Sequence, residues 1–515
     1  MIDPTANPRL PTTAILAYLA FCFALILQQV FWEGALSRND IDLLNLFVPL
    51  LFGAANLLLA WKLVRNSPLA IWNPLFWLLL ACTLYYALGQ LVHVWGHPDS
   101  VARVNTSYFV DPVGLARTNF LNTIGVTIIV ASYQATVTIL KPRIPTIMPD
   151  NGSEEHEQRS TGEARSALIL FLIIGLPIKY LLQLPYDLGL LTWVLPGSIK
   201  YLGTLSGLAI IPLCWLYRKR GGIYRVLFFA LLASESLVGL VSLSKQRMIE
   251  TILFVTLGDQ IVKPGLKKLA VSGLLTIVAY VFVMNPFVTF ARVAINRASA
   301  TNLSQTIDLA EQFNKKRTTV QDPLFPNAQL WWTRLAYSNV ELFAMREYDR
   351  GHPGTTFWLA PYTLIPRFIM PEKPGMTSGL AFTHLIEGSK TSTTFTGLGA
   401  MGEGYWNGGW LGVAVICTVI GVLLALFNRF AMHTIGARLF MFLPIPMAGI
   451  ILGLRIDDWF VPTYLGMTAQ LLLFYMAVKY AVRPLLIGSS TAAPRVLNDV
   501  TLSEKTPRQF PLVSG

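Results

Sequence analysis

Apolar residues fill most of this chain in uninterrupted stretches of membrane-spanning length, separated by short polar connections. A helix needs about 20 mostly apolar residues to cross a bilayer core. About twelve stretches approach this length, at 13–32, 41–61, 72–94, 118–140, 166–184, 198–217, 224–243, 247–262, 269–289, 408–427, 438–454 and 460–481. The runs are continuous rather than alternating, which argues against a β-barrel. The pattern predicts an all-α polytopic membrane protein with about twelve transmembrane helices.

One long polar interruption, 290–407, separates the ninth and tenth stretches. Long connections in compact proteins tend to be functional or disordered, and this one is too rich in Trp, Tyr and Phe to indicate disorder. We expect it to be an extracytoplasmic catalytic segment. Two other segments have a polar composition, and we expect 142–165 to be a cytoplasmic linker and 484–515 a disordered cytoplasmic tail. The remaining units are the N-terminal helices in 1–141, the central helices in 166–289 and the C-terminal helices in 408–483.

The charges give an expected orientation. Only 13% of the residues are charged, and the net charge is +12. Lys and Arg concentrate in alternate short connections, which marks the cytoplasmic side. This set includes Lys62, Arg65, Lys141, Arg143, Arg218, Lys219, Arg220, Lys263, Lys267, Lys268, Arg429, Arg438, Lys479 and Arg483. Both termini are then cytoplasmic and 290–407 lies outside. Because topology accounts for the basic excess, no nucleic-acid partner is expected.

A short external connection between two spans carries the sequence Ser-Lys-Gln-Arg at 244–247. Lys245 offers a point charge and Arg247 a planar fork, and the two together suit a lipid phosphate. The alternative is ordinary snorkelling of two cations at helix ends.

The stretch 364–374 contains three prolines and is expected to be an extended strap. It presents Arg367 and Lys373, either to a substrate or only to solvent. His384 follows nearby as a candidate base or donor, although a single histidine is more often a simple polar contact.

Seven glycines surround Glu403 in the stretch 397–412, and Tyr405 and Trp406 follow it. Glycines permit close backbone approach, aromatic faces suit sugar rings, and a carboxylate can accept a hydroxyl proton. The alternative is an interfacial aromatic anchor with glycine-mediated helix packing.

Apolar residues recur at helical spacing from 331 to 346 and predict one amphipathic helix on the outer surface or over the bundle. Arg334 lies on it and either reaches a phosphate or pairs with Glu341. Arg292, at the start of the interruption, is a second additional candidate for substrate binding.

The order of these features resembles the Wzy-type O-antigen and exopolysaccharide repeat-unit polymerases, which are similar to the O-antigen ligases. The strap IPRFIMPEKP and the stretch GLGAMGEGYWNGGWLG carry the resemblance, together with the cationic SKQR connection. It implies an all-helical GT-C-like glycosyltransferase in the bacterial inner membrane. The implied substrates are undecaprenyl-pyrophosphate-linked oligosaccharides, both donor and acceptor, at the outer face. It also implies metal-independent catalysis without a cofactor and, by analogy, a chain-length regulator as partner.

The chemistry gives each candidate a role. Lys245, Arg247, Arg367 and Lys373 are expected to hold pyrophosphate, with Arg292 and Arg334 as additional cations. Glu403 is the expected base, with His384 in reserve, while Tyr405 and Trp406 contact the sugars.

Three alternatives remain open. A ligase differs from a polymerase mainly in its acceptor. A metal-dependent glycosyltransferase would use Asp40 and Asp42, although carboxylates at a helix start also favour the dipole. A flippase or other transporter would need polar groups deep in the bundle; the candidates are Lys179, Lys200, Glu235 and Glu250.

Overall fold

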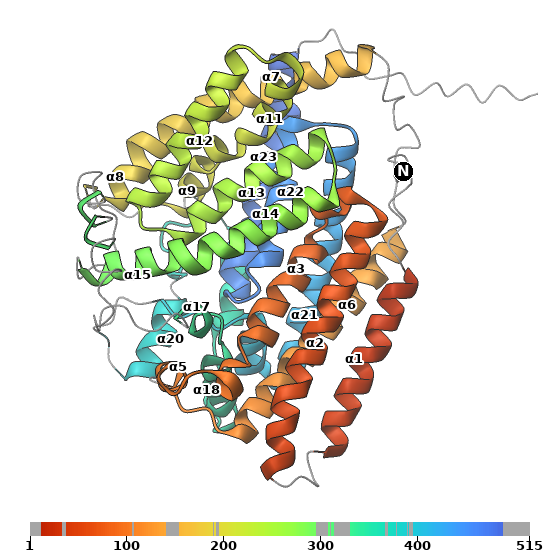
Figure 1. Ribbon diagram of the computed structural model, residues 1–515, viewed down its shortest axis with the longest axis vertical. Coiled ribbons are helices and arrows are strands. Elements are labelled where there is room, and N and C mark those ends of the chain that lie inside the picture. The colour runs from red at the N-terminus through yellow and green to blue at the C-terminus, as the bar shows by residue number, and fades with distance from the viewer. Residues whose placement is uncertain are drawn as a thin grey trace, which may run out of the picture.

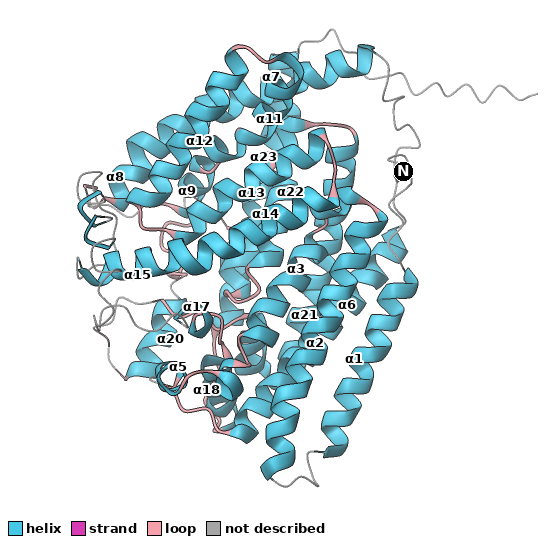
Figure 2. Cartoon of the chain, in the orientation of Figure 1, coloured by secondary structure: helices cyan, strands magenta, loops and turns pink. Residues whose placement is uncertain are grey.

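The computed structural model describes residues 12–32, 38–105, 108–140, 154–188, 190–191, 195–294, 307–309, 311–313, 330–365, 369–376, 378–388, 390 and 395–487. Helices connected by loops make up this described part of the chain, and it contains no strand (Figure 2). Arg367 lies outside the described residues. The side chain of Arg292 also lies outside them, although its backbone belongs to helix α15 (Asn285–Ala294).

Ten helices of the described chain are long and apolar enough to cross a membrane. They are Thr12–Phe31, Asp40–Asn66, Pro74–Trp95, Pro112–Leu140, Glu157–Asp187, Gly197–Arg220, Ile223–Val241, Leu266–Ala291, Ala400–Gly436 and Val461–Leu486. The prediction of a polytopic, all-helical membrane protein is confirmed. The two other expected spans are also helical but differ in character. One is α13 (Lys245–Val262), which carries charges near both ends, and the other is the short apolar segment Phe440–Leu454.

The first and last thirds of the chain pack together in one bundle. Figure 1 shows α1 (Thr12–Trp32), α2 (Arg38–Asn66), α3 (Pro74–Cys82), α6 (Pro112–Leu140) and α21 (Ala400–Gly436) side by side. The most extensive contact in the described chain joins α21 to α6, and α22 (Pro444–Leu454) packs on α3. Gly421 and Gly453 permit this approach, because an added Cβ would lie 2.5 Å from the carbonyl oxygen of Ile129 or Pro74, respectively.

The middle of the chain forms a second group. It contains α7 (Glu154–Pro177), α11 (Ile210–Arg220), α12 (Ile223–Val241), α13 and α14 (Leu266–Ala279). Helix α11 contacts α7, α12 and α13, and Figure 1 shows this group in the upper part of the molecule. The part of the polar interruption described from Leu330 onward lies at the opposite, lower end. There, α17 (Leu330–Thr333), α18 (Ser338–Asp349) and α20 (Ser378–Glu387) lie beside α5 (Pro98–Val104).

The expected single amphipathic helix over 331–346 is wrong. A turn separates α17 from α18, and α18 is packed inside the lower part of the molecule, against α21 and α6, rather than lying on a surface. Glu341 on α18 is fully buried and accepts a hydrogen bond from Asn122 Nδ2 at 2.9 Å. Burial raises the pKa of Glu341 to about 8. Arg334 lies in this turn and is exposed, whereas Glu341 is fully buried, so the two do not pair.

Helix α21 contains a sharp break at Gly408 and Gly409. Gly409 has a φ of 56°, and both residues leave the helical region. The short first segment folds back on the second so closely that a Cβ on Gly412 would lie 2.1 Å from the Gly404 carbonyl oxygen. The glycines of this stretch therefore serve helix packing, which agrees with the structural alternative considered for it.

Candidate functional site

Two cations begin helix α13 at the junction between the central helices and the lower segment. Ser244 caps this helix, its hydroxyl accepting from the Arg247 N–H at 3.4 Å. Arg247 forms an ion pair with Asp187 at 2.5 Å, and the two side chains are 22% and 18% exposed. Asp187 ends α8 (Leu184–Asp187). The partly desolvated pair fixes the Arg247 guanidinium in place.

Lys245 contacts the span Leu266–Ala291 on the other side of this junction. Its ammonium donates to the Asn285 side chain and lies 6.0 Å from the Tyr280 ring centroid. Arg334, an exposed residue from the polar interruption, lies within electrostatic range of Tyr280 as well. The structure thus brings three of the predicted substrate-binding cations, Lys245, Arg247 and Arg334, to one region.

An acidic loop, 455–459, joins α22 to the last span and faces the same region. Tyr337 donates to Asp457 Oδ2 at 2.7 Å, and Arg455 pairs with Asp458. Burial raises the pKa of Asp457 to about 6. The neighbouring Asp458 carboxylate contributes to this increase, while Tyr337 and Arg455 oppose it. Asp457 is therefore a half-buried carboxyl group that ionises near neutrality, as a general base requires.

Departures from regular α-helix surround this region. Tyr85 lies in a π-helical turn, η2 (Thr83–Leu88), and is within electrostatic range of Asp457, Tyr280 and Arg455. Tyr280 begins a second π-helical turn, η4 (Tyr280–Met284), and a third, η7 (Val461–Leu465), follows the acidic loop. Such turns are rare and occur frequently at functional sites.

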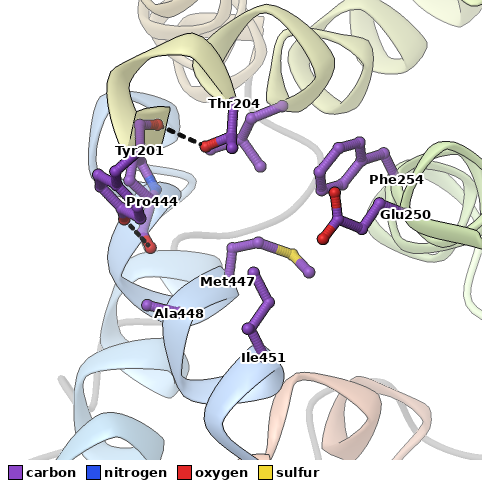
Figure 3. Close-up of a pocket in the computed structure, with 9 residues that line it drawn as sticks. Tyr201, Thr204, Glu250, Phe254, Pro444, Met447, Ala448 and Ile451 are labelled. Atoms are coloured by element: carbon purple, nitrogen blue, oxygen red, sulfur yellow. Dashed lines mark hydrogen bonds between the residues drawn. The ribbon is translucent and has the colours of Figure 1, made fainter. Parts of the chain in front are cut away.

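An apolar pocket lies between α13, α22 and the start of the sixth span (Figure 3). Its lining is Tyr201, Thr204, Leu208, Glu250, Phe254, Pro444, Met447, Ala448 and Ile451. Figure 3 shows the Glu250 carboxylate directed into the space opposite Met447 and Ile451. Glu250 accepts from Gln246 at 2.7 Å and lies within electrostatic range of Arg247 and Arg455. The pocket is thus mainly apolar, with cations beside its one acidic group.

Glu403 lies beside the acidic loop, within electrostatic range of Asp458, and its side chain is fully buried. The Phe460 N–H donates to Glu403 Oε2 at 2.6 Å, and the Thr356 hydroxyl lies beside the carboxyl group. Asn407 Nδ2 donates to Thr356 Oγ1 and to the Glu403 carbonyl, both at 2.8 Å. In this arrangement Glu403 caps the start of the last span and joins it to α21.

Tyr405 and Trp406 also contact protein groups. Tyr405 OH accepts from Arg117 at 2.9 Å and donates to Asp349 Oδ1 at 3.1 Å. Trp406 Nε1 donates to the His352 carbonyl at 3.2 Å, and its ring packs against Phe382. The Tyr405 ring packs on Tyr348 and Trp410, whereas Trp406 belongs to a separate aromatic group with Phe382 and Trp459.

The strap region contains two described candidates, Lys373 and His384. Lys373 Nζ donates to the carbonyls of Tyr362 and Ile365, at 3.1 and 2.8 Å, and so closes the strap on itself. His384 is a half-buried residue of α20.

Sequence reasoning missed Arg455 and Asp457. Their signal was an Arg and two Asp residues immediately before the last apolar stretch, but their proximity to 245–247 depends on the tertiary fold. No family model, curated protein or solved structure matches this chain.

Proposed function

We propose that this protein is an integral-membrane glycosyltransferase that joins undecaprenyl-pyrophosphate-linked oligosaccharide repeat units into a surface polysaccharide, at the outer face of the bacterial inner membrane. The observation that carries the proposal is the apolar pocket with Arg247 and Arg455 within electrostatic range of its acidic residue, Glu250. The cations suit an anionic head group, and the surrounding membrane-spanning helices suit a ligand with a long apolar chain. A polyprenyl pyrophosphate has both.

The cations provide binding and leaving-group stabilisation. Arg247 is held by Asp187 and Arg455 by Asp458, so both guanidinium groups are positioned before substrate arrives. Preorganised cations stabilise charge that develops during a reaction without the cost of reorienting solvent. Lys245 and Arg334 add positive charge on the side of the polar interruption, where the oligosaccharide part of the substrate would extend.

The proposed reaction transfers a glycosyl group between two lipid-linked oligosaccharides. A sugar hydroxyl of the acceptor attacks the anomeric carbon of the donor, and a new C–O bond forms. The bond from that carbon to the pyrophosphate oxygen breaks, and undecaprenyl pyrophosphate leaves with the electron pair. Asp457, in its ionised form, takes the hydroxyl proton. This assigns the base role to Asp457, because the Glu403 carboxylate is buried and hydrogen bonded to Phe460.

A transporter of lipid-linked oligosaccharides is the second candidate, and one observation favours it. Lys179 and Glu235 form an ion pair with side chains 8% and 5% exposed, and Ser206 donates to Glu235 at 2.8 Å. Ionisable groups within spans frequently mark transport pathways. The pair is matched and hydrogen bonded, however, and transport does not require the cationic site beside the polar interruption.

The test is a polymer assay of Arg247→Ala and Arg455→Ala, each of which removes one cation beside the pocket. We expect each to lower the rate at least tenfold, since a charge-assisted contact to a leaving group is worth more than about 1.4 kcal/mol. Arg350→Ala is the control, because Arg350 is 60% exposed and pairs only with Glu347 among the described residues. Equal rates in all three variants would show that the cationic site does not take part in the reaction.

A further inference from the structure

A second cationic site lies at the end of the molecule opposite α18, where α11 meets the loop between α21 and α22. Helix α11 ends in Arg218, Lys219 and Arg220. The Arg438 guanidinium lies 4.6 Å from the Trp215 ring centroid, and the Lys219 ammonium lies 5.5 Å from the same centroid. One buried indole thus holds two cations from segments more than 200 residues apart in the sequence.

The positive charges of this site are only partly balanced. Lys219 pairs with Glu157 at 2.9 Å, and Arg220 and Arg438 lie within electrostatic range of the same carboxylate. Three cations therefore surround one acid among the described residues. A site with this excess charge, exposed at Lys219 and Arg220, is complementary to a phosphate group.

Arg438 has an unusual backbone conformation. Its φ is 50°, in the left-handed region that non-glycine residues rarely occupy. The Arg438 N–H donates to the Ile435 carbonyl at 3.2 Å, and the Phe440 N–H donates to the Arg438 carbonyl at 3.0 Å. This conformation costs about 1–2 kcal/mol, and strain of this kind occurs often at ligand sites. Here it places the guanidinium above Trp215.

The surroundings favour a lipid over a free anion. Arg225, Lys263 and Lys267 are exposed cations near the same end. The neighbouring face of α12 exposes Ile223, Val226 and Phe229, by 64%, 63% and 54%. A phosphate head group at the cations would place acyl chains against such apolar side chains.

We infer that Lys219, Arg220 and Arg438 bind the phosphate of an anionic phospholipid at this end of the protein. The inference does not depend on the proposed enzymatic function, since it uses none of the residues assigned to the reaction.

Purified full-length protein in neutral detergent tests the inference, by native mass spectrometry with phosphatidylglycerol and phosphatidylcholine. We expect phosphatidylglycerol to bind at least ten times more tightly. The double variant Arg220→Gln/Arg438→Gln should reduce this preference at least fivefold, whereas Arg350→Gln, at the opposite end, should leave it unchanged. Arg438→Lys keeps the charge but not the fork, and should give an intermediate affinity.

Two results would overturn the inference. If the folded double variant binds phosphatidylglycerol with unchanged affinity, the lipid does not bind at Arg220 and Arg438. If the double variant does not fold, unchanged phosphatidylglycerol affinity in Arg438→Lys would contradict the inference instead. Complete displacement of the lipid by an equal concentration of inorganic phosphate would identify a free-anion site. We expect no displacement at equal concentration and weaker lipid binding at high salt.

Discussion

Asp457 is the residue on which the proposed acid–base chemistry depends. Its pKa is raised to about 6, and only its ionised form accepts a proton. Activity should therefore increase with pH through about 6 and become constant above it. Asp457→Asn should lower the rate by about 10²–10⁴ and abolish this dependence. The measurement is the pH profile of the polymerisation rate, and an unchanged profile in the variant would exclude Asp457 as the base.

Glu403 has a different expected behaviour, because its carboxylate accepts the Phe460 N–H rather than facing the cations. Glu403→Gln retains an acceptor oxygen and should keep the rate within about threefold, an effect below 1 kcal/mol. Glu403→Ala leaves that buried N–H without its partner and should destabilise the fold by about 1–3 kcal/mol. Thermal unfolding and polymer assays of both variants separate the two effects. A rate loss of a hundredfold or more in a stable Glu403→Gln variant would return the base role to Glu403.

Glu341 is expected to link stability to pH. Its folded pKa is about 8, above the ordinary value of 4.5, so folding takes up a proton between these values. The stabilisation is complete below about pH 4.5 and is lost as the pH increases through 8. Glu341→Gln removes this titration, so its stability should depend less on pH between 6 and 9, by at most about 1.4 kcal/mol per pH unit. Parallel pH dependence in both proteins, measured by thermal unfolding, would contradict the assignment.

At the scale of elements, the break in α21 depends on Gly409. A Cβ there would lie 2.8 Å from the Tyr348 ring, and the φ of 56° disfavours any L side chain. Gly409→Ala should lower the free energy of unfolding by about 1–2 kcal/mol from the backbone alone. Gly436→Ala, in the same helix, is the matched control, because a Cβ there meets no atom within 4 Å. Equal thermal stability in the two variants would show that the break does not need glycine.

The helices were predictable from sequence because a span requires a long apolar run, which is a local property. The division of 331–346 into α17 and α18 was not, because its apolar spacing continues across the turn and tertiary packing decides the outcome. The helix α13 was predicted as a span, and the helix is present. Its first residues, Lys245 and Arg247, lie at the junction with the lower segment, where Arg247 pairs with Asp187.

At the scale of the whole molecule, the site combines segments that are distant in sequence. Lys245, Arg247 and Arg334 were identified from local patterns of charge. Arg455 and Asp457 were missed, because their place beside these cations follows from the packing of the last helices on the first and central ones. Glu403, Tyr405 and Trp406 had the expected residue types, but their contacts in the folded chain are with protein groups.

We propose that this protein polymerises lipid-linked oligosaccharides. The most direct test is incubation of the purified protein with undecaprenyl-pyrophosphate-linked repeat units, with and without EDTA, and separation of the products by length. We expect a ladder of longer lipid-linked products that persists in EDTA. Loss of the ladder in EDTA would support a metal-dependent glycosyltransferase, and substrate consumption without a ladder would indicate a ligase or hydrolysis. No turnover by folded protein would contradict the polymerase assignment and favour transport.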